Sequence, residues 1–178
     1  GKDGLVIGLD RDPAVVVRAE TQLRGLPVAV AHANYADLPE VLAELKLEHV
    51  DGILLDLGLS SDQLLDANRG FSFSAEGPLD LRFDPSSGQG ASQLIARLGE
   101  RQLADMIYRY GEERHSRRIA RRIVKEREKQ PIQTADQLAR IIRASLPHFK
   151  TRPRIDPATR TFQALRIAVN EELKWLEV

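Results

Sequence analysis

The sequence predicts an α/β protein: part of a parallel sheet with its covering helices, joined to an inserted all-helical domain. Two observations carry this prediction. Short apolar runs alternate with helical patterns as far as residue 56, and from residue 91 onward the pattern is helical throughout. Between them, residues 58–90 are rich in Gly, Ser, Pro and Asp. We therefore expect a partial core over residues 1–90, a basic helical domain over 91–156 and a helix over 157–178 that returns to the core.

The first part of the chain predicts three strands and two helices. Pro13 is well placed to open the first helix, and Asp37 to cap the second. Strands and helices in alternation imply a parallel sheet with right-handed crossovers. In order, the expected elements are a strand over 5–9, a helix over 13–24, a strand over 28–31, a helix through 41–45 and a strand over 50–55.

Five helices are expected in the second part. They are separated by Pro131, Pro147 and the turn-prone segment 151–153. The segment 58–90 before them is long for a loop in a compact domain, so we expect it to be functional, and its Phe and Leu residues argue against disorder. The expected helices cover residues 91–98, 100–110, 113–129, 134–146 and 157–177.

Composition narrows the class of protein. The 178 residues, 42% of them hydrophobic, can bury the core of about one domain. No apolar run approaches the roughly 20 residues that cross a bilayer, and no secretory pattern opens the chain, so we expect a cytoplasmic protein without a membrane segment. The chain has no cysteine, and its four histidines lack metal-ligand spacing, so neither a disulfide nor a metal site is expected.

The formal net charge of zero hides a division along the chain. Residues 1–113 carry 10 Lys/Arg and 19 Asp/Glu, whereas residues 114–166 carry 15 Lys/Arg and 4 Asp/Glu. The last twelve residues carry 1 and 3. The strongly basic segment 114–166 indicates a polyanionic partner, and the acidic part of the chain indicates a different function.

Two predicted strands end in a carboxylate. The run over residues 50–55 leads into Asp56 and a Gly/Ser turn, at the strand end where open α/β sheets bind ligands. Asp10 ends the first strand, and a carboxylate at such a position can receive the two hydroxyls of a ribose. The alternatives are that Asp10 only caps the next helix and that Asp56 and Ser60 only brace a turn.

The helix expected over residues 113–129 is strongly amphipathic. On a helical wheel one arc of about 140°, opposite Ile119, Ala120 and Ile123, holds Arg114, Arg117, Arg118, Arg121, Arg122, Lys125 and Lys129. Arginine forks on such a face suit phosphate groups, and the positive excess continues beyond this helix. Nucleic acid is therefore the expected partner, and a solvated face paired with the chain's own acidic residues is the alternative. The candidate phosphate-binding residues are Arg114, Arg117, Arg118, Arg121, Arg122, Arg160 and Arg166.

Several longer motifs resemble those of one family. In order along the chain they are DLGLSSDQ at 56–63, RGFSF at 69–73, PLDLR at 78–82, GEERHSRRIAR at 111–121 and PATRTFQALRI at 157–167. Their order and spacing are similar to those of the RsmH (MraW) family. The resemblance implies an incomplete Rossmann-like core of an S-adenosylmethionine-dependent methyltransferase with an inserted all-helical domain. It further implies methylation of N4 of a cytidine in small-subunit (16S) ribosomal RNA near the decoding centre, with that RNA or the 30S subunit as partner.

The same resemblance implies specific contacts. Matching positions place cofactor contacts on Asp10, Tyr35, Asp56 and Gln63, with Tyr35 near the adenine. The exocyclic amine of cytosine is a poor nucleophile because its lone pair is delocalised into the ring. An acceptor must therefore hold the amino hydrogens. Asp56, a neighbouring carbonyl or a serine oxygen could serve, so the catalytic group stays unassigned.

The sequence also departs from the family pattern. A first strand with a glycine-rich cofactor loop and the later strands of the sheet have no counterpart here, so we expect an inactive fragment whose unpaired sheet edges a homodimer could cover. Asp156 stands where the family usually has His, which puts any function of that histidine in doubt. Two other function classes stay open from the residues alone: a nicotinamide-dependent oxidoreductase and a noncatalytic RNA-binding or ribosome-assembly module.

Overall fold

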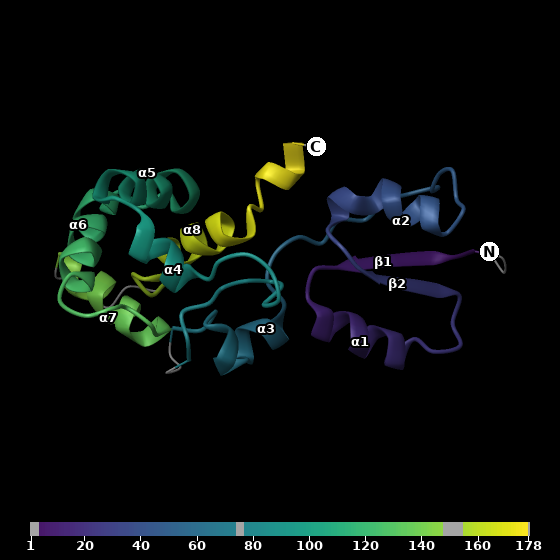
Figure 1. Ribbon diagram of the computed structural model, residues 1–178, viewed down its shortest axis with the longest axis horizontal. Coiled ribbons are helices and arrows are strands. Elements are labelled where there is room, and N and C mark those ends of the chain that lie inside the picture. The colour runs from purple at the N-terminus through teal and green to yellow at the C-terminus, as the bar shows by residue number, and fades with distance from the viewer. Residues whose placement is uncertain (1–3, 74–76, 148–154, 178) are drawn as a thin grey trace. The chain divides into compact units, whose positions relative to one another are not determined.

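The computed structural model describes residues 4–73, 77–147 and 155–177 (Figure 1). The chain divides into two compact units, which are described separately below. The first unit comprises Gly1–Leu57 with Leu173–Val178, and the second comprises Gly58–Glu172.

The first unit is built on a two-stranded parallel sheet. Strand β1 (Val6–Asp10) pairs with β2 (Val28–His32), so that Val6 lies opposite Val28 and Asp10 opposite His32. Helix α1 (Pro13–Gln22) connects the strands, and the 3-10 helix η1 (Tyr35–Asp37) and helix α2 (Leu38–Glu44) follow β2. The two strands and two helices predicted before residue 46 are thus confirmed, as is their parallel pairing.

Local hydrogen bonds explain where these helices begin. The buried carboxylate of Asp12 accepts the backbone N–H of Ala14 at 3.0 Å, and Pro13 occupies the first helical position of α1. Asp37 precedes α2 but makes no capping bond to it. Its side chain instead accepts the N–H of Asn34 at 2.9 Å, which closes the capping box of η1.

The third predicted strand is absent, and this prediction is wrong. Residues 50–55 form no strand, and in the described part of the chain the sheet consists of β1 and β2 alone. Leu54 is 93% exposed and Ile53 65%. An apolar sequence fits a strand buried on both faces, but a strand forms only where a neighbouring backbone pairs with it. No described residue pairs with the second edge of β1, so this segment has no ladder to join.

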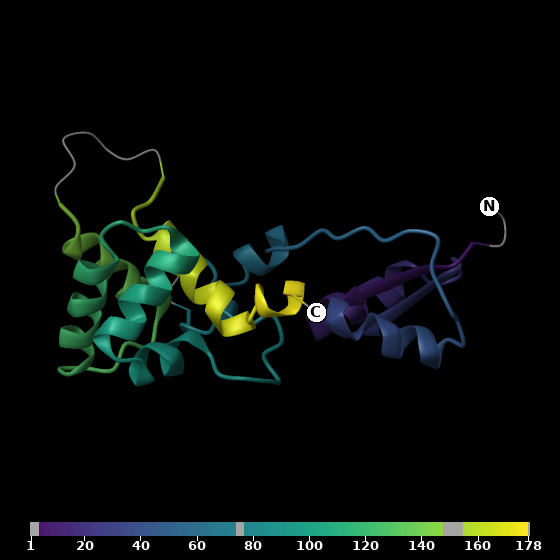
Figure 2. The ribbon, with the colours of Figure 1, turned by 90° about the horizontal axis from the view of Figure 1, so that it is seen from above.

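The second unit is helical, and the five helices predicted for it are confirmed. Their observed ends differ from the predicted ends by a few residues, and the largest difference is at the last helix. Helix α5 packs against both α6 and α8, and α6 packs against α7 (Figure 2). The helices are α3 (Ser61–Leu65), α4 (Ala91–Arg97), α5 (Glu100–Gly111), α6 (Ser116–Arg127), α7 (Ala135–Ser145) and α8 (Thr159–Asn170), with a 3-10 helix η2 (Ala67–Arg69).

Two helix ends in this unit are set by residues with a left-handed backbone conformation. Helix α6 begins three residues later than predicted, after Glu112 takes a φ of 51° and ends α5. Helix α8 ends at Asn170 because Glu171 takes the same φ. The predicted helix over 157–177 is therefore interrupted, and the 3-10 helix η3 (Lys174–Glu177) beyond it packs against η1 of the first unit.

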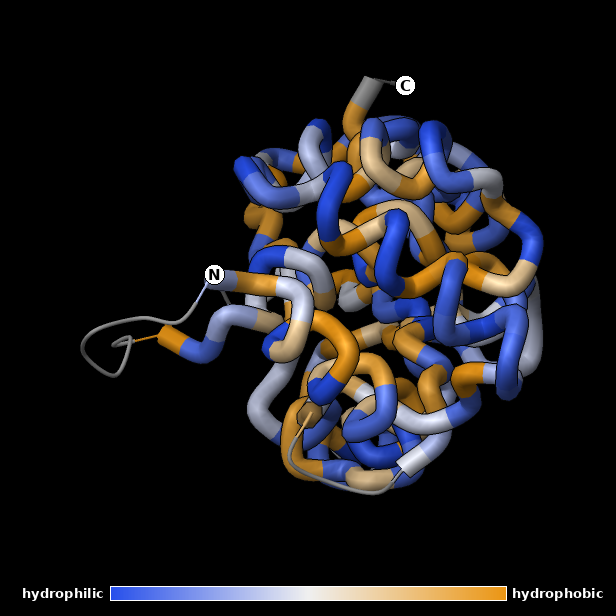
Figure 3. The backbone as a smooth tube through the Cα atoms, turned by 90° about the vertical axis from the view of Figure 1, so that its left-hand side faces the viewer, coloured by the Kyte–Doolittle hydropathy of each residue, from blue (hydrophilic) through white to orange (hydrophobic). Residues whose placement is uncertain are grey.

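The helical unit encloses a continuous apolar core. Polar and apolar residues alternate along the helices of this unit, as the blue and orange bands of Figure 3 show. The apolar stripes of α5, α6 and α7 are fully buried at Leu103, Ile107, Ile119, Ile123 and Leu138. The core therefore lies between these helices.

The segment expected to be a long loop folds onto this core. It contains α3 and η2, and its side chains at Phe71, Leu79 and Leu81 are buried with those of the helices. The capping box of Ser60 and Gln63 starts α3. Packing thus groups residues 58–90 with the helices, and the division predicted at residues 90 and 156 stays a prediction.

Candidate functional site

The carboxyl edge of the two-stranded sheet carries the first group of candidate residues. Asp10 is half-buried at the end of β1, and its Oδ1 accepts the N–H of Asp12 at 2.8 Å. Its backbone oxygen accepts the N–H of Ala33 at 3.1 Å, which ties the end of β2 to the end of β1. The second carboxylate oxygen of Asp10 makes no hydrogen bond with any residue that the structure describes, so it can accept from a ligand.

Tyr35 lies at the same edge, three residues beyond β2. Asn34 is buried and caps η1: its Oδ1 accepts the N–H of Ala36 at 3.2 Å. The half-buried Tyr35 is the first residue of η1 and is held there by this cap. Because parallel strands end at the same edge of a sheet, the topology brings Asp10 and Tyr35 to one side of the first unit.

Asp56 and Gln63 are not placed with them. Asp56 is exposed and follows no strand. Gln63 belongs to the second unit, where its Oε1 accepts the N–H of Ser60 at 3.1 Å while its own N–H donates to Ser60 Oγ at 3.1 Å. Ser60 thus braces a helix start, as the alternative interpretation expected. The cofactor contacts of Asp56 and Gln63 stay predictions.

The basic face predicted for the second unit is present on α6. Ile119, Ala120 and Ile123 are fully buried on one side of the helix. The arginines of the predicted stripe are exposed on the other side, at Arg117, Arg118, Arg121 and Arg122, with Arg114 exposed just before the helix. The wheel drawn from the sequence is therefore confirmed.

The exposed arginines differ in what they contact. Arg121 pairs with Glu100 at 3.3 Å, and Arg122 pairs with Glu126 at 2.9 Å. Lys129 also donates to Glu126, and this hydrogen bond is the main cause that lowers the pKa of the Glu126 carboxyl. Arg114, Arg117 and Arg118 make no ion pair with the described residues. Their guanidinium groups are the ones open to a polyanion.

The two arginines of α8 also differ. Arg160 is exposed and donates from Nη1 to the backbone oxygen of Glu112 at 3.2 Å. Arg166 is largely buried, forms a two-point ion pair with Glu172 at 2.8 and 3.0 Å, and lies 6.0 Å from the ring centre of Phe83. Its predicted contact with RNA stays a prediction, and that contact would compete with this pair.

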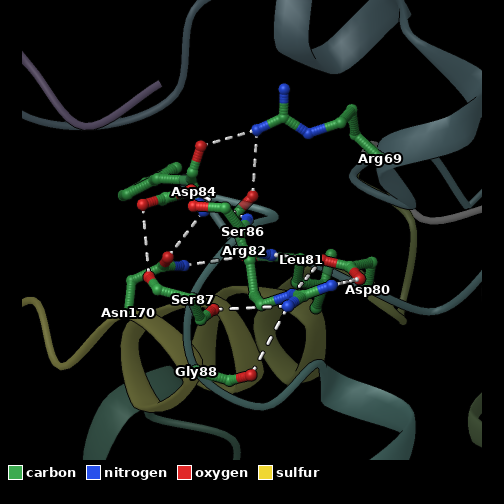
Figure 4. A network of polar contacts seen from close by, with 10 residues as sticks. Arg69, Asp80, Leu81, Arg82, Asp84, Ser86, Ser87, Gly88 and Asn170 are labelled. Atoms are coloured by element: carbon green, nitrogen blue, oxygen red, sulfur yellow. Dashed lines mark hydrogen bonds and ion pairs between the residues drawn. The ribbon is translucent and has the colours of Figure 1, made fainter. Parts of the chain in front are cut away.

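A polar network that sequence reasoning missed fixes the segment from residue 80 to 84 (Figure 4). The side chain of the buried Asn170 donates to the oxygen of Leu81 at 2.7 Å and accepts the N–H of Phe83 at 2.7 Å. Arg69 donates to the backbone oxygens of Arg82 and Phe83 at 3.0 and 2.7 Å. The segment is therefore rigidly held to α8, although it lies in what the sequence predicted to be a loop.

The same segment contains a tight ion pair and a strained residue. Arg82 contacts both carboxylate oxygens of Asp80, at 2.7 Å for the shortest, and this hydrogen bonding raises the pKa of the Arg82 guanidinium. Leu81 takes a φ of 65° while its side chain is 1% exposed. A leucine in this region is strained by about 1 kcal/mol, and its buried side chain and the Asn170 bonds hold it there.

Comparison with known proteins assigns the chain to a family. Residues 2–178 match the MraW methylase family. The chain belongs to this family. It is 48% identical over 178 residues to the ribosomal RNA small subunit methyltransferase H of Nitrosospira multiformis. The matched region covers all of this chain and 56% of that protein.

Two further relatives show a similar identity and coverage. Methyltransferase H of Citrifermentans bemidjiense is 50% identical over 177 residues, which cover 98% of this chain and 57% of that protein. That of Deinococcus radiodurans is 52% identical over 174 residues, which cover 97% and 54%. The chain thus spans about half the length of the curated relatives that it matches.

The side chain at one departure from the expected MraW pattern connects two helices. Asp156, in place of the expected His, accepts the N–H of Ala158 at 2.8 Å and pairs with Arg143 of α7 at 2.7 Å. It thereby links α7 to the start of α8. Among the described helices, none is long and apolar enough to cross a bilayer.

We expect replacement of Asn170 by Ala to destabilise the helical unit by about 1–3 kcal/mol. The change leaves the Phe83 N–H and the Leu81 oxygen without their partner, beside side chains of Leu81 and Asn170 that are buried. Urea unfolding followed by helical circular dichroism measures the effect, with the exposed α8 variant Gln163→Ala as control. Equal midpoints for the two variants would show that the network does not hold the segment.

Proposed function

We propose that this chain is part of an S-adenosylmethionine-dependent methyltransferase that acts on N4 of a cytidine in small-subunit ribosomal RNA near the decoding centre. The observation that carries the proposal is the match of residues 2–178 to the MraW methylase family, whose named relatives are ribosomal RNA small subunit methyltransferases. On this proposal β1 and β2 belong to a larger Rossmann-like sheet, and residues 91–156 are its inserted helical domain.

The donor set at the sheet edge fits the nucleoside of the cofactor. S-adenosylmethionine supplies the methyl group when it is bound. Asp10 offers a carboxylate oxygen that is free of contacts with the described residues, which suits the ribose hydroxyls. Tyr35, fixed by the Asn34 cap at the neighbouring strand end, offers a ring for the adenine.

The chemistry at the cytosine needs an acceptor for the amino hydrogens, so that the nitrogen lone pair can turn toward the methyl carbon. Asp56 is our candidate to border the target base together with Gln63. Asp56 is exposed, so no described side chain shields its carboxylate from a base.

The exposed arginines of α6 supply the RNA contact on this proposal. Between Arg117 and Lys125, which both lie within α6, the stripe runs about 12 Å, since a helix rises 1.5 Å per residue. It can therefore reach several phosphates of one strand. The partner is the small-subunit RNA or the 30S subunit, in the cytoplasm, and a homodimer that covers open sheet edges stays part of the proposal.

The proposed reaction predicts a loss of one modification. We expect small-subunit ribosomal RNA from cells without the gene to lack N4-methylation at one cytidine, and reintroduction of the complete gene to restore it. Mass analysis of nuclease fragments of the RNA measures this. An unchanged modification pattern in the deletion strain would refute the proposed function.

Asp10→Ala should weaken S-adenosylmethionine binding about tenfold or more in a protein of the relatives' full length. The reason is that a hydrogen bond to a charged group contributes roughly 1.5–3 kcal/mol. Isothermal titration measures the affinity. Asp51→Ala, which removes an exposed carboxylate elsewhere in the first unit, is the control. Equal affinity of the Asp10 variant and the parent would remove the ribose assignment.

Replacement of Arg117, Arg118 and Arg121 by Gln should lower RNA affinity and flatten its dependence on salt. Each lost phosphate contact reduces the slope of log K against log salt by about 0.7–0.9. Titrations of an RNA fragment at several salt concentrations measure the slope. The control removes the same charge from exposed arginines outside α6, at Arg97, Arg101 and Arg140. A slope that drops equally in both triple variants would indicate unspecific charge, not a binding face.

A further inference from the structure

We propose that the junction of α5, α6 and α8 binds single-stranded RNA, with one unpaired base stacked on Tyr108 and the flanking phosphates held by arginines. This inference deepens the proposed function, on which it rests for its partner being RNA. The junction patch consists of Tyr108, Arg109, Arg114, Arg117, Arg118 and Arg160.

Close packing joins the end of α5 to the start of α8. The α-carbon of Gly111 lies so near α8 that an added Cβ would overlap the backbone oxygen of Arg160, so this approach requires glycine. Arg160 in turn donates to the oxygen of Glu112 at 3.2 Å. The start of α8 is therefore fixed against the end of α5, and α6 begins only a few residues further along the chain (Figures 1 and 2).

Tyr108 is the exposed aromatic residue of the patch. Tyr108 is the residue after the fully buried Ile107 on α5, but it is itself 63% exposed. It makes no hydrogen bond or ring contact with any described side chain. Tyr110, two residues on, is different: it is half-buried, and the Arg109 guanidinium lies 5.8 Å from its ring centre. Tyr108 thus offers a free aromatic face on the rigid end of a helix.

The charges around Tyr108 favour a polyanion. Arg114, Arg117 and Arg118 are exposed and form no ion pair with the described residues. The nearby acidic residues are Asp105, which lies three residues before Tyr108 on α5 and pairs with Arg101 at 3.9 Å, Glu112, which is exposed, and Glu113. Glu113 is buried, and its Oε1 accepts the N–H of His115 at 2.8 Å. Five arginines in the patch therefore outnumber three nearby carboxylates, of which Asp105 already pairs with Arg101 and Glu113 is buried.

An aromatic face and free arginines together select unpaired RNA. In an A-form duplex the faces of the bases are stacked inside, so a duplex presents phosphates and hydroxyls but no base to an exposed ring. A single strand offers both its phosphates and its base faces, and base–aromatic stacking adds affinity that does not depend on sequence. The exposed ring would contribute nothing to the binding of a duplex.

The test compares two RNAs of equal length, one unpaired and one annealed to its complement, by fluorescence anisotropy with the 178-residue chain. We expect Tyr108→Ala to weaken binding of the single strand at least about fivefold and that of the duplex less than twofold. Tyr108→Phe keeps the ring and should bind both RNAs like the parent. Leu65→Ala, which truncates an 81% exposed side chain on α3, is the matched control.

Three outcomes would overturn the inference: an equal loss on both RNAs, no loss on the single strand, or a Phe variant as weak as the Ala variant. A chain that binds neither RNA would overturn it as well. None of these outcomes bears on the methylation of ribosomal RNA, which the gene deletion tests separately, so the two failures are distinguishable.

Discussion

The close approach of α5 to α8 is the contact on which the helical unit depends. At Gly111 the two backbones meet with no space for a side chain, and Ala164 of α8 lies on the same contact. Helices pack this closely only where small residues face each other. The contact places Ile107 of α5 and Leu165 of α8 fully inside the core. It also fixes Arg160 beside the last turn of α5, so one packing constraint determines both the core and the surface next to it.

The sheet of the first unit is limited by a different constraint. A parallel strand is stabilised by neighbours on both sides and by helices on both faces. Here β1 has one described neighbour, and among the described residues of the unit four are buried, among them Val16 and Val41. Ile53, Leu54 and Leu55 have the composition of a core strand but are largely exposed. Burial of each such side chain contributes roughly 1.5–3 kcal/mol, so this segment gains little from its present conformation.

Sequence reasoning succeeded where one local signal decided the structure. The helices of the second unit follow from their 3.6-residue periodicity, and the strands at Val6–Asp10 and Val28–His32 from short apolar runs that end in polar residues. It failed where the outcome depends on distant partners. The run at 50–55 reads as a strand, but strand formation requires a pairing edge. The segment 58–90 reads as a loop, but Asn170, which lies far from it in sequence, and Arg69, which lies within it, fix it by side-chain bonds to its backbone.

The candidate site was predictable in part for the same reason. The positions of Asp10 and Tyr35 at strand ends follow from topology, which the order of elements reveals. Which arginines are free does not follow from sequence, since it depends on partners such as Glu100 for Arg121 and Glu172 for Arg166. A wheel shows that these cations share a side, but a cation that already has a carboxylate must give it up before it can bind a phosphate.

This difference in pairing decides where on the basic surface a nucleic acid gains most. At Arg122 and Arg166 a phosphate replaces an existing ion pair, so the net gain is the difference between two similar interactions. At Arg117 and Arg118 it replaces water and counterions, and the full release of counterions favours binding. The binding free energy should therefore concentrate at the start of α6, next to the end of α5, rather than spread evenly over the stripe.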